Sequence, residues 1–211
     1  MKLTEKEMGL LKAKVESLEK DTSGEVIPLV VERSSPNGAL PDWWTSVILL
    51  LTITGIWLYE KSIDFPIALD PVLFGLSIFI VILTVVLHLN VVERFLIGRG
   101  ALTRFAEDRA LVEFMRQGLS NTRDRTGVLV FISLFEHKLE ILADRGIADK
   151  VSNDEWKQIA DRSALLLKKG HLYEALSLTL DEIGPHLKKH FPRSIGDGDT
   201  NELSDEVRVR K

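Results

Sequence analysis

Two long apolar segments divide the chain into a short N-terminal part and a long C-terminal part. Residues 43–59 contain no charged side chain, and residues 71–90 contain none when His88 is neutral. Each segment approaches the roughly 20 apolar residues that a helix needs to cross a bilayer. The pattern predicts a transmembrane hairpin over residues 41–91. Two buried helices of a globular core are the alternative, but core helices of this length rarely lack a polar face.

The charges that flank the two apolar segments are distributed unevenly. The connection at residues 60–70 has one lysine against three acids, whereas Arg94, Arg99, Arg104 and Arg109 follow the second segment. Positive residues remain on the cytoplasmic side of a membrane. The sequence therefore predicts a multi-pass protein with both termini in the cytoplasm and the lipid bilayer as a partner.

The residues before the hairpin predict one helix and one strand. Thr4 and Glu7 have the spacing of a capping box, and an apolar stripe follows over residues 5–20. Residues 25–32 are apolar and β-branched, which is typical of a strand, and Pro28 favours an edge position or a bulge.

The residues after the hairpin predict a mixed set of elements. Residues 91–119 have the spacing of a helix interrupted at Gly98 and Gly100, and Phe95, Leu102, Phe105, Val112, Met115 and Leu119 form its apolar side. An interfacial helix on anionic lipid is the alternative. Residues 128–135 and 139–143 then predict a strand hairpin, the first strand being apolar on both faces.

Two helices complete the expected fold, one after a capping box at Ser152 and Glu155 and one over residues 172–190. Residues 193–211 are polar and glycine-dotted and are predicted to be disordered.

A doubly apolar strand needs neighbours on both sides, so we expect residues 25–32 to pair with residues 128–135.

Composition excludes several classes of protein. The formal net charge of −4 gives no basic face for nucleic acid, so no nucleic-acid partner is expected. The absence of cysteine removes disulfides, thiolate nucleophiles and cysteine zinc sites. No nucleophile elbow, P-loop or HExxH motif occurs, and catalytic residues stay unknown.

Acidic residues after the second predicted strand are the best candidate for chemistry. Asp144 and Asp149 stand between that strand and the next helix, and Glu32 ends the first strand. Carboxylate oxygens suit Ca²⁺ or Mg²⁺, so these three residues are the predicted metal ligands. The alternative is that the acids complement a helix dipole or pair with arginines. His186 and His190, four apart, have the simpler interpretation of a solvated helix end.

Three segments carry a resemblance to a known family: residues 22–34, residues 121–151 and residues 170–192. With the apolar pair, the chain resembles bacterial members of the TPM domain family in which two membrane helices interrupt the domain. The resemblance implies the bacterial inner (cell) membrane and an α/β/α sandwich. It divides the chain into a first helix and strand (1–40), the hairpin (41–91), the rest of the domain (92–192) and a tail (193–211).

Two functions follow from this resemblance. Family members have been linked to assembly of membrane complexes, to cation binding by loop carboxylates and to phosphatase-like activity. The first hypothesis is a membrane-anchored interaction or assembly module with protein partners at the inner membrane face. The alternative is a divalent-cation-dependent phosphatase-like hydrolase. Whether the chain is an enzyme stays open, because the glycine-rich turn of the family is reduced here to residues 143–147 with only Gly146.

Overall fold

The computed structural model describes residues 1–36, 89–122, 124–193 and 206–210, together with short stretches between residues 47 and 86. The chain divides into two compact units, one of Met1–Ser35 with Thr103–Lys211 and one of Pro36–Leu102. The second unit contains helix α4 (Asn90–Ile97), which ends at Gly98 with a φ of 81°. This left-handed glycine is the predicted interruption.

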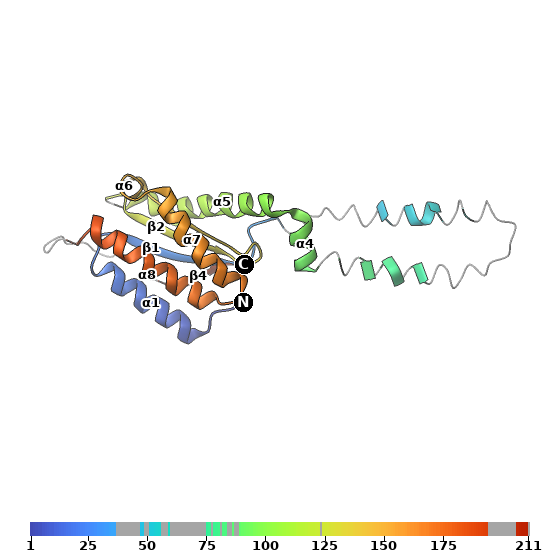
Figure 1. The fold of residues 1–211 in the computed structure, drawn as a ribbon, viewed down its shortest axis with the longest axis horizontal. Coiled ribbons are helices and arrows are strands. Elements are labelled where there is room, and N and C mark those ends of the chain that lie inside the picture. The colour runs from blue at the N-terminus through green and yellow to red at the C-terminus, as the bar shows by residue number, and fades with distance from the viewer. Residues whose placement is uncertain are drawn as a thin grey trace. The chain divides into compact units, whose positions relative to one another are not determined.

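A four-stranded sheet in the order β3-β2-β1-β4 lies at the centre of the first unit (Figure 1). β1 (Glu25–Val31) pairs in parallel with β2 (Gly127–Ser133) on one side and with β4 (Arg208–Arg210) on the other. β3 (Lys138–Ala143) is antiparallel to β2. The predicted strand hairpin and the predicted pairing of residues 25–32 with residues 128–135 are both confirmed.

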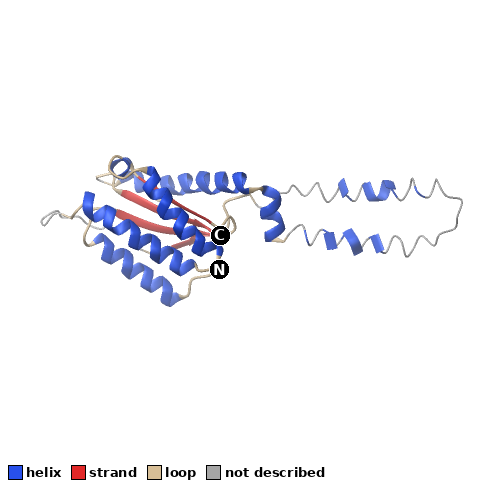
Figure 2. Ribbon diagram, viewed as in Figure 1, coloured by secondary structure: helices blue, strands red, loops and turns tan. Residues whose placement is uncertain are grey.

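Helices cover both faces of this sheet (Figure 2). On one face, α1 (Glu5–Glu19), α7 (Asn153–Lys168) and α8 (Leu172–His190) share a core with the sheet. On the other face, α5 (Arg99–Arg116) and the short helix η1 (Leu119–Asn121) pack on β1 and β2. A one-turn helix, α6 (Arg145–Ala148), follows β3. The predicted mixed α/β class is confirmed.

The predicted capping boxes begin α1 and α7. Thr4 Oγ1 accepts a hydrogen bond from the Glu7 backbone N–H at 3.3 Å, and Glu7 Oε2 accepts from the Thr4 N–H at 2.7 Å. Ser152 and Glu155 make the same reciprocal pair at 3.3 and 2.9 Å. Each box satisfies backbone donors that the first helical turn leaves unpaired.

The buried face of α5 differs from the prediction. Leu102 is buried as expected, but Val112 and Met115 are exposed by 58% and 62%. Ala106 and Ala110 face the sheet instead. Phe114 also packs on this layer, and the two alanines let the middle of the helix approach the large side chains of β1 and β2 closely.

The tail prediction is wrong at its end. Residues 193–211 were expected to be disordered, yet Arg208–Arg210 form β4 against β1. The tail is polar as a whole, but it contains a short alternation of valine and arginine. This alternation suits a strand when the edge of a partner strand is available. Residues 194–205 lie outside the described residues.

The predicted membrane location is contradicted. Residues 43–59 and 71–90 lie largely outside the described residues. In the part of the chain that the structure does describe, no helix is both long enough and apolar enough to span a bilayer. α4 has eight residues and would cover only about 12 Å, and the longer α8 carries charged side chains. The transmembrane hairpin is thus unsupported, and the predicted multi-pass location in the inner membrane is wrong.

Gly127, at the start of β2, provides a test of the packing beneath the sheet. A Cβ at this position would lie 2.5 Å from the Leu119 carbonyl oxygen. We expect Gly127→Ala to lower the free energy of unfolding by about 1–3 kcal/mol, because the strand would have to move. Urea unfolding measures this change.

Gly9→Ala on α1 is the matched control. A Cβ at Gly9 meets nothing within 4 Å, so alanine should stabilise the helix by about 0.5–1 kcal/mol. Equal effects of the two substitutions would show that Gly127 is not under packing constraint.

Candidate functional site

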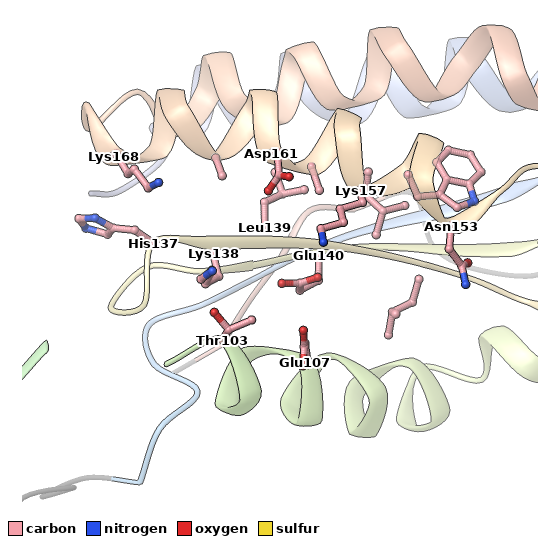
Figure 3. Close-up of a pocket in the computed structure, with 15 residues that line it drawn as sticks. Thr103, Glu107, His137, Lys138, Leu139, Glu140, Asn153, Lys157, Asp161 and Lys168 are labelled. Atoms are coloured by element: carbon pink, nitrogen blue, oxygen red, sulfur yellow. The ribbon is translucent and has the colours of Figure 1, made fainter. Parts of the chain in front are cut away.

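A pocket of about 590 Å³ lies along the outer edge of β3, between α5 and α7 (Figure 3). We call it the β3 groove. Residues 137–142 contribute the strand and its turn, and α5 contributes Thr103 and Glu107. Its α7 wall consists of Asn153, Trp156, Lys157, Ala160, Asp161, Ala164 and Lys168. The volume is within the range of about 300–1,000 Å³ that is usual for binding pockets.

The strand in the groove has a free side. β3 is the last strand of the sheet, and no described segment pairs with its outer edge. Asp144 N–H donates to the Gly127 carbonyl at 2.8 Å. Because ladder bonds alternate in an antiparallel pair, the backbone groups of Leu139 and Ile141 face away from β2. They are available to a further strand.

The local sequence explains why β3 stands at this edge. His137, with a φ of 52°, makes the tight return from β2. Leu139 and Ile141 are buried in the core shared with α7 and α8, whereas Lys138 and Glu140 alternate with them and are only partly buried. A strand with one apolar and one wetter face suits an edge.

Charged side chains of both signs line the groove. Lys138, Lys157 and Lys168 supply positive charge, and Glu107, Glu140 and Asp161 supply negative charge. Figure 3 shows Glu107 on α5 and Glu140 on β3 pointing toward one another, with Lys157 reaching down from α7. The site can therefore recognise polar groups as well as backbone.

Glu140 is the most perturbed acid of the groove. Burial, and after it the nearby Glu107 carboxylate, raise the pKa of Glu140 to about 7, although Lys138 and Lys157 oppose the shift. A carboxyl with a pKa in this range changes charge near neutral pH. A ligand can thus meet Glu140 as a donor or as an anion.

Trp156 places an unpaired donor at the groove wall. Its ring is 3% exposed, and its indole Nε1 has no hydrogen-bond partner among the described residues. His186 packs against this ring at 5.7 Å between centroids. A buried indole N–H normally has an acceptor, so Trp156 is a polar group of the α7 wall without its usual partner among the described residues.

The structure separates the three predicted metal ligands. Asp144 begins α6: its Oδ1 accepts from the Arg145 N–H at 2.7 Å, and its Oδ2 is buried without a hydrogen-bond partner. Asp149 ends the same short helix and is exposed. Two of the predicted residues thus lie at the same end of the sheet.

Glu32 lies at the opposite end. Its carbonyl accepts from the Phe135 N–H just beyond β2, whereas Asp144 bonds to Gly127 where β2 begins. The seven residues of β2, at about 3.3 Å each, separate these ends by roughly 20 Å. Glu32 therefore cannot share an ion with Asp144. Within the described ranges, no group of three or more His, Asp or Glu side chains has the arrangement of a metal site.

Glu136 is a polar residue whose role the sequence did not reveal. Its carboxylate accepts hydrogen bonds from the backbone N–H of Ser34 and Ser35, the latter at 2.7 Å, and from Ser133 Oγ. The sequence places Glu136 between the two strands of the predicted hairpin. Ser34 and Ser35 are about a hundred positions away, so no local pattern marks Glu136 as the residue that fixes the end of β1.

Comparison with known proteins agrees with the fold. Residues 90–185 match the model of the TPM domain family. This match covers the region from α4 into α8 and confirms that part of the resemblance. No curated protein matches the chain.

One solved structure with a similar fold is the NMR structure of BA42 protein from the psychrophilic bacterium Bizionia argentinensis. The TM-score is 0.59 at 20% sequence identity, over 99% of this chain and 96% of the other. At this identity the similarity concerns the fold alone.

Glu140→Gln tests the electrostatics of the groove. The folded-state pKa of about 7 is above the ordinary glutamate value of 4.5, so the folded protein binds the proton more tightly than the unfolded chain. This contribution to stability is full below pH 4.5 and is lost as the pH rises through about 7. At pH 8 we expect Glu140→Gln to be more stable than wild type by about 1–3 kcal/mol.

The difference should vanish near pH 4.5, where both side chains are neutral. Urea unfolding across the pH range measures it, with Glu16→Gln on α1 as a control. A constant difference at every pH would contradict the assignment to the titration of Glu140.

Proposed function

We propose that this chain is a protein-interaction module that binds an extended segment of a partner in the β3 groove. The observation that carries the proposal is the open edge of β3 at the floor of a pocket walled by α5 and α7. An extended peptide can add to such an edge as a further strand, with backbone hydrogen bonds for affinity and side-chain pockets for specificity.

The groove chemistry supports a peptide rather than an apolar small molecule. The outward backbone groups of Leu139 and Ile141 match a second backbone. Lys157, Lys168 and Asp161 stand on the α7 wall, Glu107 stands on the α5 wall, and Lys138 and Glu140 lie on the strand between them. These groups suit a segment that alternates polar and apolar side chains, because neighbouring residues of a strand point to opposite faces.

This proposal keeps one part of the first sequence hypothesis. An interaction or assembly role needs a surface that selects a partner, and the β3 groove supplies a candidate. The membrane anchor is not part of the proposal.

A bulky residue in the groove tests the proposal. Thr103 lines the α5 wall, so Thr103→Trp should fill part of the groove. A random library of short linear peptides, selected on the wild-type protein, supplies the probes. We expect the selected peptides to bind Thr103→Trp at least about tenfold more weakly, measured by fluorescence polarisation.

Ala13→Trp is the matched control, because Ala13 is exposed on α1, an element that does not line the groove. Peptide binding should be unchanged in this variant. Amide chemical-shift changes on peptide binding should concentrate on β3 and α7. Peptides that bind both variants equally, or that shift amides elsewhere, would refute the groove as the binding site.

A second candidate function rests on Asp144. Its Oδ2 is buried and unpaired, and the Asp124 and Arg125 carbonyls approach Gly146, where a Cβ would lie 2.8 and 2.7 Å from them. A buried carboxylate oxygen without a hydrogen-bond partner suits a hard cation such as Ca²⁺ or Mg²⁺. Asp144, with Asp149 as the second acid, would hold this ion. A bound cation polarises a phosphoryl oxygen, as the phosphatase-like alternative requires.

Calorimetric titration with Ca²⁺ and Mg²⁺ tests this candidate. We expect Asp144→Asn to weaken binding at least about tenfold and Asp149→Asn to weaken it less, because Asp149 is exposed. Glu32→Gln is the control and should leave the affinity unchanged, since it lies at the other end of the sheet. Equal losses in all three variants would indicate diffuse electrostatic attraction instead of a site. Phosphomonoester hydrolysis that persists in Asp144→Asn would exclude this ion from catalysis.

A further inference from the structure

The outer edge of β1 is occupied by the chain's own C-terminal strand. Leu29, Val30 and Val31 pair in parallel with Arg208, Val209 and Arg210. The Glu32 N–H donates to the Arg210 carbonyl at 3.1 Å. This edge is distinct from the β3 groove, since β3 and β4 are at opposite sides of the sheet.

Both arginines of β4 meet polar side chains of α5. Arg210 donates to Glu113 Oε2 at 3.0 Å, and Arg208 donates to Gln117 Oε1. Glu113 is completely buried, and Gln117 is 7% exposed. A buried carboxylate needs cationic partners, so the pairing is selective for arginine or lysine at this position.

The acceptors are held in place by α5 itself. Gln117 Nε2 donates to Glu113 Oε2 at 3.1 Å, and Arg109 contacts Glu113 Oε1 at 3.1 Å. These contacts come from within one helix and do not require β4. We call Glu113, Gln117 and the outer edge of residues 29–32 the β1 docking edge.

Pro28 sets one limit of this edge. Because the Glu32 N–H points toward β4, alternation directs the N–H of Val30 and the nitrogen of Pro28 to the same side. Proline has no hydrogen to donate, and the pairing with β4 begins one residue later, at Leu29. The docking edge is therefore short.

The resident strand makes few contacts. β4 has three residues, and Val209 is 57% exposed. Val207 packs on the core of the opposite face, and Glu206 makes a long ion pair with Lys12 at 3.7 Å. A strand this short, with its central residue exposed, is held weakly and opens readily.

We propose that the β1 docking edge is a binding site for an extended Arg-x-Arg segment of a partner protein, and that the chain's own C-terminal strand occupies it until the partner displaces it. Backbone pairing with β1 gives the strand orientation. Glu113 and Gln117 accept hydrogen bonds from two arginines on one face of the segment. The alternate residues lie on the side of the sheet that α1 and α8 cover.

Competition between the tethered strand and a free peptide tests this proposal. The probe is a labelled synthetic peptide with the sequence of residues 206–211. In the wild-type protein, the tethered strand competes at an effective concentration on the order of millimolar. The full-length variant Arg208→Glu, Arg210→Glu places like charges against Glu113 and should release its own strand. We expect this variant to bind the peptide at least tenfold more tightly than wild type.

Two controls separate this effect from general charge. Lys2→Glu, Lys6→Glu makes the same charge change just before and at the start of α1 and should bind the peptide as weakly as wild type. A peptide with both arginines replaced by glutamine should bind the released variant at least tenfold more weakly than the original peptide. Equal binding of the two peptides, or equal binding to wild type and the released variant, would overturn the proposal.

A measurement on the wild-type protein covers the case in which the released variant does not fold. Saturating peptide should displace the resident strand, so the amides of Arg208, Val209 and Arg210 should shift by NMR, while β3 should stay unchanged. Perturbation confined to β3 would overturn the assignment to the β1 docking edge. Exchange of strands between two copies, without uptake of free peptide, would also overturn it.

Discussion

The parallel pairing of β1 with β2 is the constraint on which the rest of the unit depends. All seven residues of each strand are buried, although nearly a hundred residues separate them along the chain. A sheet buried on both faces needs helices on both sides. α1, α7 and α8 cover one face, and α5 covers the other. The first 35 residues are therefore part of the core and cannot be an appendage to it.

This central pair leaves two sheet edges, and the chain treats them differently. Exposed edges invite unwanted pairing with other chains, and charged side chains reduce that risk. At one edge, β3 presents Lys138 and Glu140 inside a groove. At the other, β4 covers β1 and fixes its arginines on α5. The helices that shield each edge also give it chemical selectivity, which is why both proposed binding sites lie there.

Local chemistry explains which parts were predictable. The capping boxes at Thr4 and Ser152 each involve only four consecutive residues. The apolar residues on both faces of β2 predict that this strand is buried. Joint metal ligation by Asp144 and Glu32 would require β1 and β3 to finish at the same end of the sheet. The turn at His137 reverses β3, so Asp144 returns to the start of β2. The predicted strand hairpin already implied this reversal, but the place of each acid after a strand does not report how far apart the two acids lie.

The polar residues of α5 that line the two proposed binding sites could not be identified from sequence spacing either. On α5, sequence spacing marked the large apolar residues as the buried side, whereas the sheet accepts Ala106 and Ala110 and buries Glu113. Glu107 faces the β3 groove, and Glu113 faces β4. Six positions at about 100° per residue place these two acids roughly 120° apart around the helix axis. One helix lying over the centre of the sheet can thus supply an acid to each edge, and its alanines allow the close approach that this requires.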